Sequence, residues 1–406
     1  MKLLVFGGWQ LIDSTTSGGA VRIASILRRL AKLGHMIDYF TLAPSCRDYD
    51  LHGINVHEIG YPLLSKVLLR TQLIQRILAS LKSHSAVEIF LTLSPLLALK
   101  SRPYMKSADV VWLNYSSNLF PLLFAKQQHL PCILDTHGLS QPLIKTSKDD
   151  LPPVPYWARF LLLGLVDRIA YSVADRIIVT SQFEKRLCEM LFGVRPDKVE
   201  FVENGVDVDE FKPDRQKGVE TRRKLGIPEN AVVIVFVGYM KHLPNVQAAK
   251  YIIECLMPHI SFKEPEAWML LVGEHGRLGI KNLSGKLLLT GRVSDLAAVI
   301  NAADICIAPL VIGTGIKTKV LTYMACEKVV VSTPIGVEGL GVTDGKEALI
   351  CSIEEFAEKV VFAIRNITVL SDMGRRARDF VCKYHSWNKI VEKADRMLEA
   401  MQTATS

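Results

Sequence analysis

Two series of short apolar runs, separated by helical or loop segments, limit the fold of this chain more than any other feature. The first series occupies residues 2–6, 36–42, 108–114, 132–138, 174–181 and 199–205. The second series occupies residues 231–238, 268–274, 287–291, 304–310 and 329–334. Continuous apolar runs that alternate with helices are typical of parallel strands covered on both faces. The sequence therefore predicts an α/β fold with two doubly wound parallel sheets in tandem.

The length of the chain fits two domains. Its 406 residues exceed one ordinary hydrophobic core. A charged stretch, Asp207–Arg223, follows the first series and is interpreted as the linker. The domains are therefore predicted to span residues 1–206 and 207–386. The last segment, 387–406, carries apolar residues at helical spacing and is expected to form a helix that packs on one of the two domains.

Composition excludes several classes of protein. Apolar residues make up 49% of the chain and charged residues 22%, which excludes global disorder. The eight cysteines form no C-x-x-C motif, which favours reduced core thiols over a metal cluster. The net charge of +8 comes without an obvious basic run, so no nucleic-acid partner is expected. An anionic small substrate, an anionic membrane surface and no special partner all remain compatible with this charge.

The apolar stretches of the sequence are too short to cross a bilayer, and MKLLVFGG at the start lacks the pattern of a signal peptide. We therefore expect a cytoplasmic protein. The segment Leu63–Lys82 reads as a basic, roughly amphipathic helix. Such a helix either lies on anionic lipid or packs in the core with a solvated basic edge. Peripheral contact with the inner membrane face is one of these two alternatives.

Ligands of open α/β sheets bind at the carboxyl ends of the strands, so the loops there hold the candidate site residues. Gly18-Gly19 precedes a helix and suits an anion, although the pattern is not G-x-G-x-x-G. Gly313–Lys319 combines two glycines with Lys317 and Lys319, which favours a diphosphate. His137 ends a strand and is positioned to donate to a substrate hydroxyl or to shuttle a proton. Each feature also has a purely structural interpretation, as a turn, a surface loop or a core histidine.

A pair of acidic residues, Asp207 and Asp209, suggests a metal–diphosphate site at first sight. The pair lies in NGVDVDEFKP, where Asn204-Gly205 and Pro213 indicate a turn and a linker. A structural role is therefore the preferred interpretation.

Many stretches in a fixed order resemble the retaining family four glycosyltransferases of the GT-B fold, also called glycosyl transferases group 1. They include SGGAVR, ILDTHG, ADRIIVTSQFEK, ENGVDVDEFKP, FVGYMKHLPNVQAAKYI, LTGRVSDLAAVINAADICIAPL and GTGIKTKVLTYMACEKVVVSTPIGVEGL. The resemblance covers most of the chain. It implies two Rossmann-like domains facing across a cleft, with the acceptor on the N-terminal domain and the nucleotide-sugar on the C-terminal one. It also implies that the terminal helix returns to the N-terminal domain.

The resemblance further implies a role for individual residues. Gly18 and Gly19 would lie near the donor phosphates, His137 near the transferred sugar, and Arg292 and Val293 beside the base. The diphosphate would be bound by the backbone and charges of a larger set: Gly313, Thr314, Gly315, Ile316, Lys317, Lys319 and Lys241. Glu338 would be a further polar contact. The implied reaction is metal-independent and retaining, uses a UDP- or GDP-sugar and no cofactor, and acts on a glycan or lipid-linked acceptor in polysaccharide or glycolipid biosynthesis.

The sequence departs from the family at two places. Two glutamates common in the family align with Thr314 and Thr322, and Thr322 could still bind a ribose hydroxyl through one oxygen. Tyr239 stands where many relatives have an arginine, although Lys241 is nearby. A subgroup with a G-x-M…P-N pattern, which Gly238, Met240, Pro244 and Asn245 match, manages without that arginine and without the lysine that many relatives have a few residues later.

These departures leave two interpretations open. The chain is either an active glycosyltransferase or a catalytically weak or inactive GT-B-like protein that binds a sugar nucleotide or glycan. A nicotinamide oxidoreductase is disfavoured because no G-x-G-x-x-G follows the first strand.

Overall fold

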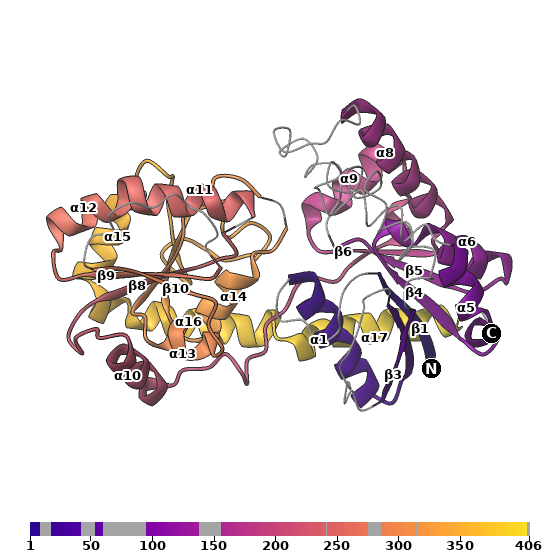
Figure 1. Ribbon diagram of the computed structural model, residues 1–406, viewed down its shortest axis with the longest axis horizontal. Coiled ribbons are helices and arrows are strands. Elements are labelled where there is room, and N and C mark those ends of the chain that lie inside the picture. Colours follow the sequence, from indigo (N-terminus) through magenta and orange to yellow (C-terminus); the bar gives the residue numbers. More distant parts are fainter. Residues whose placement is uncertain are drawn as a thin grey trace, which may run out of the picture. The chain divides into compact units, whose positions relative to one another are not determined.

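Parallel pairing joins the strands of this protein into two separate sheets (Figure 1). The computed structural model describes residues 1–8, 18–41, 53–59, 95–137, 156–240, 242–274, 286–313 and 315–403. The chain divides into two compact units, of which the first comprises Met1–Glu203 and Ile390–Ser406 and the second Asn204–Lys389. The predicted α/β fold with two parallel sheets is confirmed.

The sheet of the first unit has seven strands in the order β3-β2-β1-β4-β5-β6-β7. They are β1 (Lys2–Gly8), β2 (Met36–Thr41), β3 (Ile54–Glu58), β4 (Val110–Asn114), β5 (Cys132–Asp135), β6 (Arg176–Val179) and β7 (Val199–Phe201). Every pairing is parallel. The chain adds β2 and β3 on one side of β1 and the later strands on the other, so the order reverses between β1 and β4.

Helices cover this sheet and bury its apolar residues. The helical elements are α1 (Gly18–Lys32), α5 (Pro95–Met105), η1 (Ser116–Asn118), α6 (Leu119–Gln127), α8 (Tyr156–Val173), α9 (Gln182–Phe192), η3 (Pro196–Lys198) and α17 (Trp387–Thr403). Leu4 and Phe6 of β1 share one core cluster with residues of α5, α6, α8 and α9. In α17, Asp395 contacts His35 with Oδ1 and Nε2 2.8 Å apart, which ties this helix to the first unit.

The sheet of the second unit has six parallel strands in the order β10-β9-β8-β11-β12-β13, and its order reverses between β8 and β11. They are β8 (Val233–Val237), β9 (Trp268–Val272), β10 (Leu287–Gly291), β11 (Ile305–Ala308), β12 (Val329–Ser332) and β13 (Leu349–Ile350). Alternate residues of β8 point to opposite faces, because Val233 and Val235 belong to one core cluster and Ile234 and Phe236 to the other.

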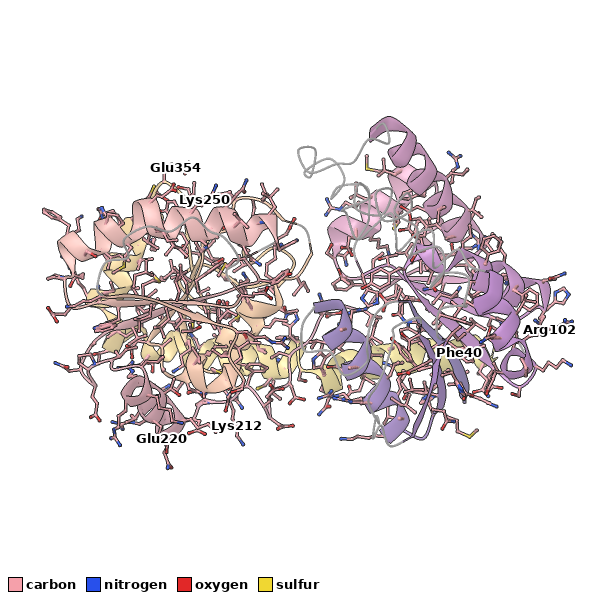
Figure 2. The ribbon with its side chains drawn as sticks, viewed as in Figure 1. Phe40, Arg102, Lys212, Glu220, Lys250 and Glu354 are labelled. Carbon is pink, nitrogen blue, oxygen red and sulfur yellow. The ribbon has the colours of Figure 1, made fainter. Side chains whose placement is uncertain are left out.

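The two faces of this second sheet carry different helices (Figure 1). α11 (Leu243–Tyr251), the π-helical η4 (Ile252–Leu256), α12 (Met257–Lys263) and α15 (Phe356–Arg365) bury one face. α13 (Leu296–Asn301), α14 (Thr318–Ala325) and part of α16 (Ile367–Tyr384) bury the other. Figure 2 shows exposed charged side chains such as Lys250 of α11 pointing outward, whereas Phe40 of β2 is buried in the first unit.

The charged stretch interpreted as a linker is only partly one. Residues 215–224 form the helix α10 (Arg215–Lys224). The Asp214 side chain accepts a hydrogen bond from the Lys217 backbone N–H and caps the helix. Gly218 lies so close to α13 that an added Cβ would be 2.5 Å from the Asn301 carbonyl oxygen. This helix therefore packs against α13 in the second unit, although most of its residues are polar or charged.

Candidate functional site

The carboxyl ends of β4 and β5 hold two residues in strained backbone conformations. Tyr115, directly after β4, has φ 70° and ψ 143°, and His137, two residues after β5, has φ 50°. Residues other than glycine rarely adopt positive φ, and the strain of about 1–3 kcal/mol persists only where the surroundings hold it. The two rings stack, with centroids 4.6 Å apart. This pair lies beside the reversal point of the sheet, where ligands of open α/β sheets bind.

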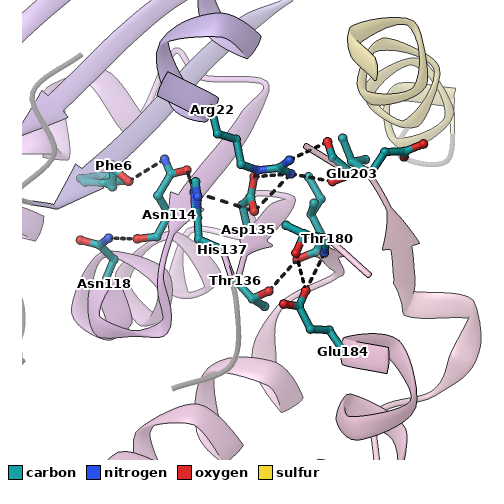
Figure 3. Close-up of polar contacts among 12 residues, drawn as sticks. Phe6, Arg22, Asn114, Asn118, Asp135, Thr136, His137, Thr180, Glu184 and Glu203 are labelled. Atoms are coloured by element: carbon teal, nitrogen blue, oxygen red, sulfur yellow. Dashed lines mark hydrogen bonds and ion pairs between the residues drawn. The ribbon is translucent and has the colours of Figure 1, made fainter. Parts of the chain in front are cut away.

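Asn114, the last residue of β4, fixes the His137 ring (Figure 3). The Asn114 amide nitrogen donates to the Phe6 carbonyl oxygen at 3.0 Å, so its Oδ1 faces the other way as an acceptor. That Oδ1 lies 2.7 Å from Nε2 of His137. Because an amide oxygen only accepts, Nε2 of His137 must carry the proton of this hydrogen bond. We infer that the tautomer of His137 is set by the amide of Asn114.

The other ring nitrogen of His137 has no hydrogen-bond partner among the described residues. This Nδ1 atom is buried, and a Cβ added to Gly19 would lie 3.8 Å from it. Burial is the main reason that the pKa of His137 falls to about 4; nearby Arg22 lowers it further, against the opposing charge of Asp135. His137 is therefore neutral near pH 7 and presents a lone pair at Nδ1. From the sequence, His137 was either a hydrogen-bond donor or proton shuttle, or a structural histidine; in the structure its Nδ1 is a hydrogen-bond acceptor without a partner among the described residues.

The lowered pKa of His137 predicts a pH-dependent stability. An unfolded histidine titrates near pH 6.5, so below that pH the unfolded chain binds a proton that the folded chain excludes. The contribution of His137 to the free energy of unfolding is complete above pH 6.5 and is lost as the pH falls toward 4. The loss between pH 7 and pH 5 is about 2 kcal/mol. His137→Asn tolerates the left-handed backbone and does not titrate. Urea unfolding of both proteins should show a smaller loss of stability over this range in the variant; equal losses would contradict the assignment.

The start of α1 packs against the same two rings. A Cβ on Gly19 would approach the Tyr115 hydroxyl oxygen to 2.5 Å, so a larger residue there would force the Tyr115 side chain to shift. Behind it, the buried Arg22 side chain forms an ion pair with Asp135, with Nη2 and Oδ2 3.2 Å apart. Arg22 also donates to the carbonyl oxygens of Val202 and Glu203, both at 2.8 Å (Figure 3). The structure thus brings Gly19 and His137 together, with Gly18 as the first residue of α1.

The corresponding edge of the second unit is formed by the loop between β11 and α14. Gly313 has φ 132° and Gly315 has φ 71°, both in the region that favours glycine, which explains the two glycines of this loop. Ile316 is buried in the core and anchors the loop. Thr314 lies outside the described residues, as does Lys241.

Lys317 precedes α14 and is held over the loop. Its Nζ donates to the Gly315 carbonyl oxygen at 2.5 Å and lies 3.6 Å from Oε2 of Glu338. The Lys317 side chain is only 10% exposed, so the ion pair with Glu338 is partly desolvated. Glu338 thus lies beside Lys317, and its contact with a donor stays a prediction.

Lys319 lies two residues further, in the first turn of α14, and has a different environment. Its Nζ donates to Oδ1 of Asn245 at 2.6 Å and lies 4.2 Å above the centroid of the Phe236 ring. Burial, and to a lesser degree the charge of Lys317, lowers the pKa of Lys319 to about 7. No carboxylate pairs with Lys319 among the residues that the structure describes. An ammonium group placed this way lacks a counterion and is suited to bind an anion.

Thr322 occupies the second aligned glutamate position and is used by its own helix. Its hydroxyl donates to the Lys319 carbonyl oxygen at 2.7 Å. The hydroxyl proton is thereby engaged, so the side chain can only accept a hydrogen bond from a ligand. A hydrogen bond accepted by this neutral hydroxyl would be weaker than one accepted by a carboxylate.

The remaining predicted residues follow strands of the same sheet. Arg292 and Val293 come directly after β10; the Arg292 side chain is exposed, whereas Val293 packs against the core. Because the strands are parallel, the loops after β8, β10, β11 and β12 lie at one edge of the sheet. The structure therefore places Arg292, Val293, Lys317, Lys319 and Glu338 at the same edge.

Asp207 has the structural role preferred from the sequence. Its Oδ1 accepts hydrogen bonds from the backbone N–H groups of Asp209 and Glu210, both at 3.1 Å. Such bonds define an Asx turn. In the described part of the chain, no group of three or more His, Cys, Asp or Glu side chains is arranged to hold a metal ion.

Sequence reasoning missed three residues that shape these sites. Arg22 was visible as a charged residue in an otherwise apolar helix face, whereas Asn114 and Tyr115 carry no local signal. The basic segment Leu63–Lys82 lies outside the described residues. Within the described ones, no helix is long and apolar enough to span a bilayer.

Comparison with known families identifies both halves of the chain. Residues 16–210 match the model of Glycosyltransferase Family 4, and residues 231–366 match that of Glycosyl transferases group 1. The D-inositol 3-phosphate glycosyltransferase of Kribbella flavida is 27% identical over 428 residues, covering 97% of this chain and 93% of that protein. The UDP-Gal:alpha-D-GlcNAc-diphosphoundecaprenol alpha-1,3-galactosyltransferase of Escherichia coli is 27% identical over 198 residues, covering 46% of this chain and 47% of that protein.

Solved structures share the fold over the whole chain. Anabaena Alr3699/HepE in complex with UDP-glucose has a TM-score of 0.71 at 16% identity, covering 98% of this chain and 100% of that one. WaaG, a glycosyltransferase involved in lipopolysaccharide biosynthesis, has a TM-score of 0.66 at 13% identity, covering 98% and 99%. With two matching family models, glycosyltransferase relatives and the GT-B fold, the chain belongs to the family 4 glycosyltransferases of glycosyl transferases group 1.

Proposed function

We propose that this glycosyltransferase moves a sugar from a nucleotide-sugar to a hydroxyl of a glycan or lipid-linked acceptor, with retention of configuration and without a metal ion. The observation that carries the proposal is the pair Lys317 and Lys319 beside a glycine loop at the carboxyl edge of the second sheet. Glycine backbone and lysine charge are suited to a diphosphate. We propose Gly313–Ile316, Lys317, Lys319 and Lys241 as its ligands.

In the proposed reaction, the bond between C1 of the sugar and the diphosphate oxygen breaks while C1 bonds to the acceptor oxygen on the same face. The acceptor proton passes to an oxygen of the leaving diphosphate. The protein stabilises the charge that develops on that diphosphate and orients the sugar. Lys317 and Lys319 supply the charge in place of a metal. His137 would orient the sugar by accepting a hydroxyl hydrogen bond at Nδ1, with Gly18 and Gly19 admitting the ligand at the start of α1.

For the donor, we propose a UDP-sugar first and a GDP-sugar second. HepE was solved with UDP-glucose, and the Escherichia coli relative is named for UDP-Gal. Arg292 and Val293 would lie beside the base, and Thr322 would accept from a ribose hydroxyl. A lipid-linked acceptor is favoured by the diphosphoundecaprenol in the name of the same relative.

The function is tested with a panel of UDP, GDP, ADP and their sugars, read by thermal shift and then by donor hydrolysis and transfer. We expect stabilisation by UDP, or by GDP, and none by NAD(H). Stabilisation by NAD(H) alone would overturn the proposal.

Since the lysines supply the positive charge, we expect EDTA to leave nucleotide binding and turnover within about two-fold of the untreated enzyme. A large loss that Mg²⁺ restores would refute metal independence.

A second candidate function is nucleotide-sugar or glycan binding with little or no transfer. It is favoured by Thr322, which stands where many family members have a glutamate. Its hydroxyl donates to the Lys319 carbonyl oxygen, so no carboxylate is available at this position to bind a ribose. Binding of UDP or GDP with no hydrolysis or transfer on any acceptor would support this candidate. Measurable turnover of a nucleotide-sugar would eliminate it.

We further propose a cytoplasmic enzyme with peripheral contact to an anionic membrane, on the basis of the Leu63–Lys82 sequence and the lipid-linked acceptor in the name of one relative. Co-sedimentation with vesicles containing phosphatidylglycerol tests this contact. Recovery of all protein in the supernatant at low salt would exclude it.

A further inference from the structure

The G-x-M…P-N pattern of residues 238–245 has no assigned role in the proposed reaction, yet the structure gives each of its members a contact. A Cβ on Gly238 would lie 2.8 Å from Cγ of Asn245, so glycine is needed for the asparagine to pack there. Met240 is buried in the core, and Pro244 occupies the first turn of α11. A Cβ on Gly313 would lie 3.8 Å from Cγ of Pro244, so the pattern adjoins the glycine loop.

Asn245 is the member of this pattern that contacts a charged group. Its side chain is 8% exposed, and its Nδ2 donates to the Tyr239 carbonyl oxygen at 3.0 Å. Because Nδ2 is engaged by a carbonyl, Oδ1 must face the opposite side, where Nζ of Lys319 lies at 2.6 Å. The orientation of the amide is therefore fixed by the backbone of the loop after β8, and the ammonium of Lys319 is fixed by the amide.

The neutrality of Asn245 matters because of what else surrounds Lys319. The ring of Phe236 in β8 faces the Lys319 ammonium. The charge of Lys319 acts on His242, whose pKa burial and this charge lower. The charge of Lys317, at the start of α14, repels that of Lys319. The carboxylate of Glu338 lies 3.6 Å from Nζ of Lys317. Asn245 thus supplies a hydrogen bond without a negative charge, which leaves the charge of Lys319 uncompensated by the described residues.

We infer that Asn245 is a positioning residue that holds the Lys319 ammonium in place without neutralising it, so that its charge remains available to a phosphate of the nucleotide. This inference rests on the proposed function. On this inference, the P-N pattern holds the side chain of a lysine from α14 against the loop after β8. In that loop, Tyr239 stands where many relatives have an arginine.

A consequence is that nucleotide binding is coupled to a proton. A phosphate beside Lys319 favours the ammonium over the amine, so binding draws a proton onto Lys319 in the range above its lowered pKa of about 7. Phosphate groups have lost their second proton above about pH 7, so the nucleotide itself contributes little there. The affinity of the wild-type enzyme should therefore fall as the pH rises from 7 to 9.

The test is calorimetric titration with UDP, or with GDP where that is the nucleotide bound, between pH 7 and pH 9 in two buffers of different ionisation enthalpy. Asn245→Asp places a carboxylate on Lys319, which raises the pKa of the lysine and neutralises it. We expect roughly 10-fold weaker binding at pH 7 and loss of both the pH dependence and the proton uptake. An unchanged affinity and an unchanged proton uptake would refute the inference while leaving the proposed function intact.

The variant Asn245→Leu tests whether Asn245 acts through Lys319 or only through its packing. It also takes the place of Asn245→Asp if that variant does not fold. In the wild-type background it should weaken nucleotide binding, because Lys319 loses its anchor. In a Lys319→Met background it should have no further effect, because its influence passes through the lysine. Equal weakening in both backgrounds would show a merely structural role. Absence of UDP and GDP binding to the wild-type enzyme would instead refute the proposed function, and this inference with it.

Discussion

Replacing Lys319 with methionine is expected to weaken UDP binding roughly 10- to 100-fold at pH 7, the effect of losing a hydrogen bond to a charged group. Methionine retains most of the apolar stem, so it should keep the packing over Phe236 while removing the ammonium. Calorimetric titration with UDP, or with GDP where that is the nucleotide bound, measures the loss. The affinity of the variant should also be independent of pH between 7 and 9.

Lys328→Met is the matched control for this variant. Lys328 also binds a neutral acceptor, the Asn301 carbonyl oxygen at 3.2 Å, and burial likewise lowers its pKa. It follows the other end of α14, away from the glycine loop. Its replacement should change stability without changing nucleotide affinity. Equal losses of affinity in the two variants would show that Lys319 acts on the fold and not on the ligand.

Replacing His137 with alanine is expected to lower kcat roughly 100-fold with a small change in the KM of the donor, since misplacement of the reacting sugar costs about this much. The acceptor nitrogen Nδ1 would be lost, and Oδ1 of Asn114 would lose its donor. Steady-state kinetics with the donor identified in the panel measures both constants.

His35→Ala provides the comparison for His137. His35 is also buried and bonds to a carboxylate, that of Asp395 at 2.8 Å, but it precedes β2 at the opposite edge of the same sheet. Its loss should reduce stability and leave kcat per folded molecule unchanged. A similar fall of kcat in both variants would mean that His137 contributes only to the fold.

The strands of both sheets were largely predictable, because a strand buried on both faces leaves a continuous apolar run. Each run of the two series contains a strand of the structure. The strands β3 and β13 were missed for the opposite reason. β3 reads INVHE and is only partly buried, and β13 has two residues, so neither has an apolar run to detect.

The chemistry of the site was less predictable, because it depends on contacts between distant residues. The sequence located His137 but not the amide of Asn114 that fixes its tautomer. It located Lys319 and, separately, the P-N pattern, but nothing in either stretch indicated that Asn245 and Lys319 touch. For Thr322 the residue type suggested a ribose contact, while the rotamer directs its proton into α14.

The division of α17 between the two units bears on the order in which the protein folds during synthesis. The second unit is continuous in sequence, whereas the first needs residues 390–406 to be complete. His35 and Asp395, which join α17 to the first unit, are 360 residues apart along the chain. Contacts of such separation form late, since the intervening loop must close first. On the ribosome, the second unit can therefore fold first, while the first unit, although most of it is made earlier, cannot be completed until residues 390–406 have been synthesised.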